Sequence, residues 1–197
     1  GPGVDSLMPR LELVAAIAGG VGYAASTTRF APICGVQGTA QDTEARFEIR
    51  ARSAYTRANL FVRATSNAAT ADSTITSRRN TAGGNLTVTI GGGLTGTFED
   101  TVNSDAVASG DLVTSQIVTG AGGTLGLSII GCTLDGPDTI LCSSATAATG
   151  EILVNASFIA VVGLNEDNLT ESVGQYTFRG ATTLSNLRCW VVSNGVG

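Results

Sequence analysis

The sequence contains no histidine and no lysine, and its 11 basic residues are all arginines. Histidine is the commonest general base and a frequent metal ligand, and lysine is the residue that reaches the phosphates in a P-loop. The chain also has no GxSxG segment that would place a serine nucleophile on a strand-to-helix turn. We therefore expect a protein that is not an enzyme, with no catalytic residues and no cofactor.

Charged residues are also scarce. They make up 14% of the chain, whereas about a quarter is usual. The net charge is −5 and the isoelectric point is about 4.6. Because binding to nucleic acid without sequence specificity requires a basic surface, we expect no nucleic-acid partner. Five arginines do cluster in the sequence, and we interpret them as the solvated face of two strands: Arg46, Arg50, Arg52, Arg57 and Arg63.

No apolar run is long enough to cross a bilayer. The longest candidate, residues 11–25, is interrupted by Glu12 and three glycines, so we expect no membrane partner. Within it, Leu11, Val14, Ala15 and Ala18 recur at helical spacing ahead of a glycine pair, which predicts a short helix. We interpret residues 1–25 as an apolar N-terminal arm that docks on another chain or on its own sheet, with another chain favoured.

The four cysteines do not form a metal motif. No CxxC spacing occurs among Cys34, Cys132, Cys142 and Cys189, and no histidine can join them, so a zinc site is not expected. Cys132 and Cys142 flank a turn-rich loop. Either a disulfide closes that loop or the cysteines are buried free thiols, and the second alternative is favoured. The acidic loop residues lack the ordered spacing of a calcium site: Asp135, Asp138, Glu166, Asp167 and Asn168.

What the sequence does contain is the composition of an all-β protein. Glycine, threonine, serine, alanine and asparagine are abundant, and turn residues recur every 8–12 positions, as in a sandwich or barrel. The pattern predicts strands at residues 28–34, 45–52, 58–65, 73–78, 86–90, 96–100, 111–118 and 124–130. We place an antiparallel sandwich at residues 26–149, with these core residues: Phe47, Ile49, Leu60, Val62, Val88, Ile90, Val113, Ile117, Leu127 and Ile129.

An internal repeat organises the rest of the chain. Residues 43–67 align with residues 170–194 at nine identical positions of 25, and with one residue dropped Phe30 and Gly35 fall on Phe158 and Gly163. We interpret residues 150–197 as a partial second repeat that is too short to bury a core of its own. Its strands are expected to pair with a neighbour or to link subunits through Val161, Val162, Leu187, Trp190 and Val191.

Several segments together resemble a known class of module. They are residues 28–35 (TRFAPICG), 43–45 (TEA), 58–63 (ANLFVR), 73–80 (STITSRRN), 86–90 (LTVTI), 96–101 (GTFEDT) and 107–113 (VASGDLV). Their series resembles the jelly-roll modules of tailed-phage virion proteins, which occur in head fibres, capsid decoration proteins and tail fibres. It is more distantly similar to trimeric jelly rolls of the tumour-necrosis-factor and complement-C1q type.

The resemblance implies a homotrimer with a structural or adhesive role on a virion, in contact with other virion proteins such as a capsid shell. It carries over no catalytic set. The leading hypothesis is therefore a capsid decoration or fibre subunit that acts by assembly. The alternative is a receptor- or glycan-binding module at a fibre tip, which needs an exposed aromatic residue or an Asn/Asp-lined pocket at loop tips.

Other candidate sites have plainer interpretations. The adjacent carboxylates Glu99-Asp100 and Glu166-Asp167 would point to opposite faces of a strand, so they are read as turn and rim residues rather than a glycosidase pair. Trp190 can stack on a sugar ring, but a place in the core or at a subunit interface is favoured. The sequons at Asn85, Asn155 and Asn168 are expected by chance in a chain this rich in serine and threonine.

Overall fold

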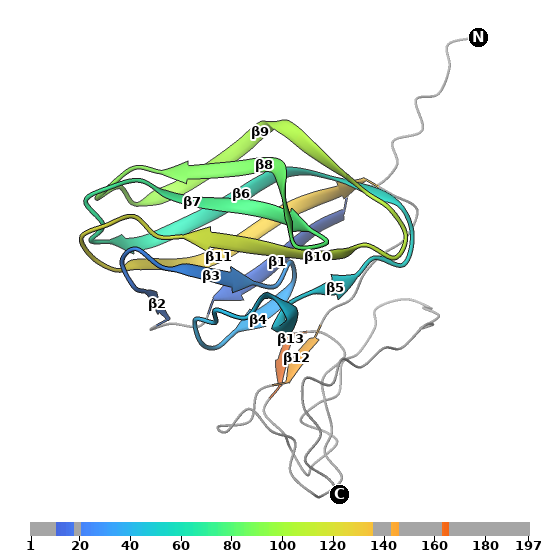
Figure 1. Cartoon of the computed structure of the whole chain (residues 1–197), viewed down its shortest axis with the longest axis horizontal. Coiled ribbons are helices and arrows are strands. Elements are labelled where there is room, and N and C mark those ends of the chain that lie inside the picture. Colours follow the sequence, from blue (N-terminus) through green and yellow to red (C-terminus); the bar gives the residue numbers. More distant parts are fainter. Residues whose placement is uncertain (1–10, 18–20, 136–142, 146–162, 166–197) are drawn as a thin grey trace, which may run out of the picture. The chain divides into compact units, whose positions relative to one another are not determined.

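The computed structural model describes residues 11–17, 21–135, 143–145 and 163–165, and within them it is all-β apart from one short 3-10 helix (Figure 1). The chain divides into two units, Gly1–Ile140 and Leu141–Gly197. In the first unit, two largely antiparallel sheets face each other across a shared apolar core. This arrangement confirms the prediction of an all-β, sandwich-like fold.

The larger sheet has six strands in the order β4-β1-β11-β6-β9, with the short β2 also paired to β11. Its long strands are β6 (Tyr55–Asn67), β9 (Gly96–Val107) and β11 (Leu125–Asp135). The strands β1 (Leu11–Ile17) and β2 (Gly22–Tyr23) pair with successive parts of β11. The sheet ends at β4 (Gly35–Gln37), which runs parallel to β1.

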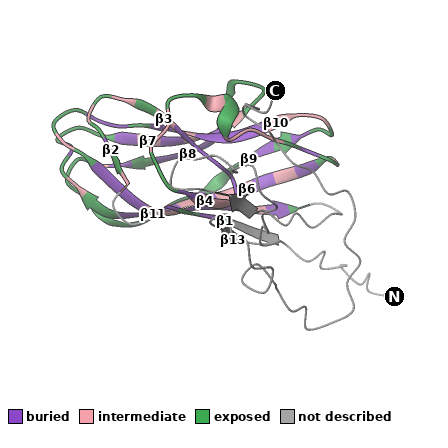
Figure 2. Cartoon of the chain, turned by 90° about the horizontal axis from the view of Figure 1, so that it is seen from below, coloured by how far each residue is buried: buried purple, intermediate pink, exposed green. Residues whose placement is uncertain are grey.

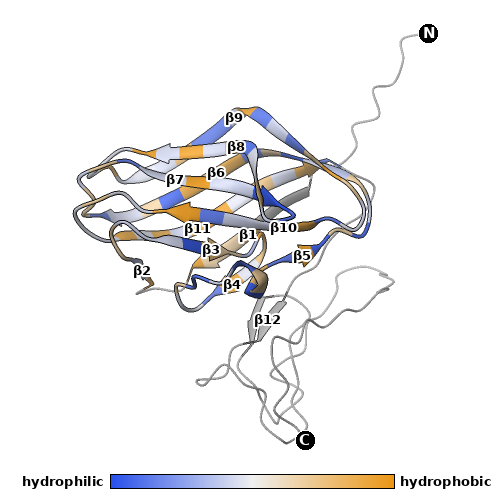
Figure 3. Ribbon diagram, viewed as in Figure 1, coloured by the Kyte–Doolittle hydropathy of each residue, from blue (hydrophilic) through white to orange (hydrophobic). Residues whose placement is uncertain are grey.

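The smaller sheet has five strands in the order β3-β10-β7-β8, with the short β5 also paired to β10. They are β3 (Thr28–Ala31), β5 (Ile49–Arg50), β7 (Ser73–Arg79), β8 (Ala82–Ile90) and β10 (Leu112–Val118), and every pairing is antiparallel. Along β8 buried leucine, valine and isoleucine alternate with exposed threonines, so one face meets the core and the other meets water (Figure 3).

The core lies between the two sheets (Figure 2). Seven predicted core residues are buried, namely Leu60, Val62, Val88, Ile90, Val113, Ile117 and Leu127. The prediction is wrong for Phe47, Ile49 and Ile129, which are only partly buried. Phe47 and Ile49 follow the 3-10 helix η1 (Glu44–Arg46) at the margin of the smaller sheet, and Ile129 follows a register shift in β11 that breaks the alternation.

Polar side chains form hydrogen bonds between the two sheets along both lateral edges of the sandwich. On one side, Asp100 and Asp105 of β9 accept hydrogen bonds from the backbone N–H groups of Asn85 (2.6 Å), Leu86 (3.4 Å) and Thr87 (2.9 Å) along the free edge of β8. On the other, Gln37 of β4 donates to the Phe30 carbonyl of β3 (2.9 Å) and accepts from the Tyr23 hydroxyl (2.8 Å). These bonds join the two sheets and occupy backbone groups that an added strand would need.

Two segments differ from the sequence prediction. Residues 11–17 form strand β1 rather than a helix, and this part of the predicted arm belongs to the sheet of its own chain. The alternation of apolar and polar residues at 45–52 predicted one strand, but the structure has η1 followed by the two-residue strand β5. Elsewhere each predicted strand overlaps an observed one, and β6, β9 and β11 extend beyond their predicted ends.

The second unit contains one described pair of strands, β12 (Ser143–Ala145) and β13 (Gly163–Asn165), which run parallel. The pair repeats the only other parallel pairing among the described strands. Ala15 pairs with Gly35 in the first unit and Ser143 pairs with Gly163 in the second, so both partners are shifted by the same 128 residues. The Gly35/Gly163 match is the one that the internal sequence repeat predicts.

Candidate functional site

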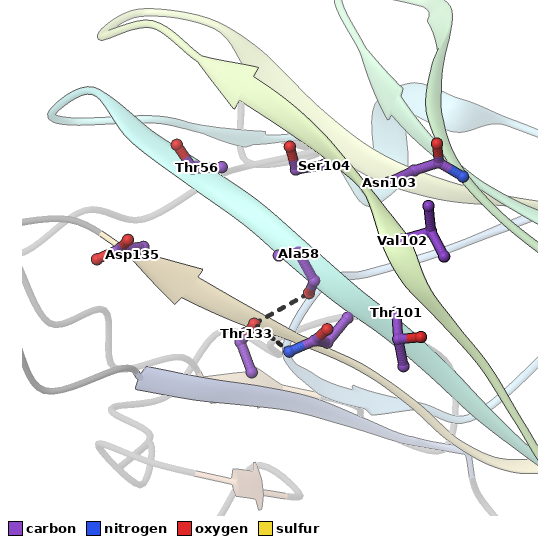
Figure 4. A pocket seen from close by; sticks show the side chains of 9 residues that line it. Thr56, Ala58, Thr101, Val102, Asn103, Ser104, Thr133 and Asp135 are labelled. Atoms are coloured by element: carbon purple, nitrogen blue, oxygen red, sulfur yellow. Dashed lines mark hydrogen bonds between the residues drawn. The ribbon is translucent and has the colours of Figure 1, made fainter.

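A hollow of about 300 Å³ opens on the outer face of the six-stranded sheet, on the side away from the core (Figure 4). Its floor and walls come from the three long strands β6, β9 and β11. The lining is made almost entirely of small polar side chains: Thr56, Ala58, Asn59, Thr101, Val102, Asn103, Ser104, Thr133 and Asp135.

The hollow exists because the pairing of β6 and β9 is irregular. Ala58 pairs with Ser104 and Leu60 pairs with Asp100, so one residue of β6 lies opposite three residues of β9. The residue on β6 is Asn59, whose φ of 49° is in the left-handed region that asparagine tolerates better than most residues. The extra residues of β9 bulge outward and carry the Val102 side chain into solvent, where it is 90% exposed.

Asp100 fixes the conformation of this bulge. Its carboxylate accepts hydrogen bonds from the backbone N–H groups of Val102 (3.2 Å) and Asn103 (3.1 Å), from the Asn103 side chain and from Thr87 of β8. Burial alone would raise the pKa of Asp100, but the hydrogen bonds stabilise the charged form and lower the pKa to about 2. The aspartate is therefore a charged structural anchor at neutral pH.

On the opposite side of the hollow, Asn59 and Thr133 are held in place by each other. The Asn59 amide donates to the Thr133 hydroxyl (3.4 Å), and that hydroxyl donates to the carbonyl of Ala58 (3.1 Å) (Figure 4). The register shift between Gly131 and Thr133 of β11 lies next to this contact. The wall therefore presents fixed hydroxyl and amide groups on rigid strands.

The lining of the hollow is polar and carries one carboxylate. That carboxylate is Asp135, which lies opposite Thr56 in the β6–β11 register. Among the described residues, no group of three or more metal-ligating side chains lies close enough together to hold a metal ion. Fixed amides and hydroxyls with one exposed apolar side chain can instead bind a small polar ligand or a protein surface.

The structure separates several residues that the sequence placed together. Asp100 is buried and anchors the bulge, whereas its neighbour Glu99 is exposed on the other face of β9. Asn85 lies exposed on β8, and its amide contacts the Ser104 carbonyl at 3.4 Å. The other predicted residues of loops, sequons and linking strands lie outside the described residues: Asp138, Asn155, Val161, Val162, Glu166, Asp167, Asn168, Leu187, Trp190 and Val191.

The structure corrects the interpretation of Arg57 and decides between the two alternatives for Cys132. Arg57 does not lie on a solvated face with the other arginines, because it is 1% exposed and points into the sandwich. A disulfide between Cys132 and Cys142 is excluded, because Cys132 is a buried free thiol. The preference for free thiols holds for Cys132 but fails for Cys34, which is disulfide-bonded.

The hollow was not predicted from the sequence. Its signals were an asparagine within a strand that otherwise alternates and an aspartate three residues before an asparagine, Asp100 and Asn103, which is a pattern typical of a side-chain-stabilised turn. Comparison with known proteins gives no assignment: no family model matches the chain, and no curated protein matches it significantly. Among the described residues, no helix has the length and apolar character needed to cross a membrane.

Proposed function

We propose that this chain is a structural subunit of a virion, of the capsid-decoration or fibre type, which acts by assembling with copies of itself. The observation that carries the proposal is the outer face of the six-stranded sheet. Its exposed and half-buried positions include Val14, Phe61, Ile129 and Val102. Burial of these apolar positions in a subunit contact costs little desolvation free energy, and each Å² of apolar surface buried would contribute about 25 cal/mol.

Local packing covers part of the β11 backbone on that face. Gly131 of β11 lies between Val14 of β1 and Phe61 of β6, and the Phe61 ring covers the glycine. Arg63 lies opposite Ile129 and Glu99 lies opposite Phe61 in the strand register, and both charged residues are exposed. Phenylalanine and arginine are both enriched at protein interfaces.

The strand order supports a jelly roll in particular. The sheets are β1-β11-β6-β9 and β3-β10-β7-β8, and the chain changes sheet between β6 and β7, β8 and β9, β9 and β10, and β10 and β11. Interleaving of this kind is what two Greek keys produce. Most segments that carry the resemblance to virion jelly rolls lie in or beside β3, β6, β7, β8, β9 and β10.

The second unit supports a tandem arrangement. Its parallel pair β12 and β13 matches β1 and β4 in direction and in register, as expected if the unit Leu141–Gly197 belongs to a second copy of the sandwich. On this proposal the strands of that copy take their partners from a neighbouring subunit. The resemblance to trimeric jelly-roll modules implies that the assembly contains three subunits.

Two valines allow a matched test of the proposed interface. Val14 lies on the outer face of the six-stranded sheet and Val118 lies on the outer face of the other sheet, and both are 39% exposed. We expect Val14→Glu to reduce the native mass from trimer to monomer and Val118→Glu to leave the trimer intact. Size-exclusion chromatography with light scattering measures both. Equal behaviour of the two variants would refute this face as the interface.

A second candidate function is recognition of a glycan by the hollow. The observation in its favour is the lining, in which Asn59, Asn103 and Asp135 accompany four hydroxyl side chains. Saccharides are recognised through hydroxyl groups, which pair with such donors and acceptors. A glycan array should give reproducible binding that Thr133→Val and Asp135→Asn abolish; silence for the wild-type chain would exclude this candidate.

A further inference from the structure

Arg57 is a buried cation that joins the two sheets through the core. It lies on β6 and is 1% exposed. Its Nη1 donates to the Ser77 hydroxyl of β7 (3.2 Å) and to the Thr114 carbonyl of β10 (3.3 Å). Both acceptors are uncharged, so they satisfy hydrogen bonds without compensating the positive charge.

Among the described residues, no carboxylate lies within ion-pair distance of this guanidinium. In the part of the chain that the structure describes, the two ion pairs are Arg78–Glu44 and Arg79–Asp111. Asp105 is opposite Arg57 in the β6–β9 register, but its oxygens accept hydrogen bonds from the β8 backbone. An arginine in an apolar interior normally has an anionic partner, because burial of an uncompensated charge costs several kcal/mol.

The groups around Arg57 are donors that lack an acceptor. Arg57 Nε, the Tyr55 hydroxyl and the Ser115 hydroxyl are all buried and make no hydrogen bond. Ser115 pairs with Ser77 in the β7–β10 register, so it belongs to the same cluster. Burial raises the pKa of Tyr55 to about 12, with a smaller opposing effect from the Arg57 charge. The tyrosine therefore remains a protonated donor throughout the neutral range.

We propose that Arg57, Tyr55 and Ser115 bind a small inorganic monoanion, with chloride as the model ligand, between the two sheets. A guanidinium N–H and two hydroxyls can all donate to one anion, and the anion supplies the negative charge that the cluster lacks. A water molecule accepts at most two hydrogen bonds and leaves the charge uncompensated. The site is independent of the proposed assembly, because it lies inside one sandwich.

Anion-dependent stability tests the site directly. At constant ionic strength, replacing gluconate by chloride should raise the unfolding midpoint by about 3 °C for each tenfold increase in chloride above its Kd. Arg57→Met and Ser115→Ala should abolish or reduce this dependence. Arg63→Met, which removes an exposed arginine from the same strand, should keep it.

A crystal grown with bromide provides a second measurement that needs no variant. The proposal predicts an anomalous peak beside Arg57 Nε and the two hydroxyls in the wild-type chain. A midpoint that does not depend on chloride, or an anomalous map with no peak at this position, would overturn it and leave internal water as the occupant. If Arg57→Met does not fold, the wild-type crystal and Ser115→Ala decide the question.

Discussion

Asp100 shows how one side chain determines the local shape of a strand. Its carboxylate satisfies two backbone N–H groups of the β9 bulge and one of the free edge of β8. Each of these partly buried hydrogen bonds contributes on the order of 1 kcal/mol. A single residue therefore holds the wall of the hollow and joins the two sheets.

Acid should weaken this anchor. The folded-state pKa of Asp100 is lowered to about 2 from an ordinary value of 3.8, so the stabilisation is complete above the ordinary pKa and is lost as the pH falls toward 2. After allowance for solvent screening it is about 1 kcal/mol. Urea unfolding between pH 7 and pH 2 measures this loss, which Asp100→Asn should remove at the cost of lower stability at pH 7.

The neighbouring carboxylate is the control for this experiment. Glu99→Gln removes an exposed charge from the same strand and should leave the pH profile close to that of the wild type. If the two variants give the same profile, the acid-sensitive group is not Asp100.

At the residue level the sequence predicted the apolar core better than the polar interior. Alternation placed Leu60, Val62 and Val88 correctly, because burial of apolar side chains follows the strand period. The clustering of arginines in the sequence placed Arg57 in solvent, but the register shift after Ala58 lets Arg57 and Leu60 both face the core. A β-bulge depends on the pairing of two strands. The alternation of apolar and polar residues along the sequence therefore does not indicate where that alternation shifts.

At the level of elements, strands with strong alternation and clear turns were predictable. β7 and β10 lie within one residue of their predicted bounds, whereas β8 begins at Ala82, four residues before its predicted start. Residues 11–17 have helical spacing of apolar residues, but pairing with β11 outweighs this local preference. The long loops between strands have no periodic signal, so their packing could not be predicted.

Several of these loops meet at Gly120, whose backbone forms hydrogen bonds with two other segments of the chain. Its N–H donates to the Ser73 hydroxyl (2.9 Å) and its carbonyl accepts from the backbone of Ser26 (3.1 Å). A Cβ atom on Gly120 would fall on the backbone carbonyl of Ala71, which cannot move as a side chain can. We expect Gly120→Ala to reduce the free energy of unfolding by more than about 2 kcal/mol.

Gly83→Ala is the matched substitution. Gly83 lies exposed on β8, and a Cβ atom there would meet the Thr76 methyl group at an ordinary 3.9 Å. Chemical denaturation should show little change for this variant. A cost for Gly120→Ala no larger than that for Gly83→Ala would mean that the loops are not packed as described.

At the level of the whole molecule, the sequence repeat predicts a relation between the two units. The matched parallel pairs in the two units agree with that relation. The hollow and the buried arginine had no comparable signal, because each depends on residues that are distant in the sequence. Neither the repeat nor the alternation of apolar residues identifies an assembly partner.

Removal of residues 150–197 tests the role proposed for the second copy. If its strands link subunits, the truncated chain should lose the native assembly while the sandwich keeps its far-ultraviolet circular dichroism. An unchanged native mass after truncation would show that the second unit does not hold the subunits together.

The native mass of the 197-residue chain is the most direct test of the central claim that the protein works by self-assembly. One chain has a mass of 19.8 kDa. Native mass spectrometry at micromolar concentration should give a species of three times that mass as the principal form. A principal species at the mass of one chain, unchanged as the concentration increases, would contradict the proposed function.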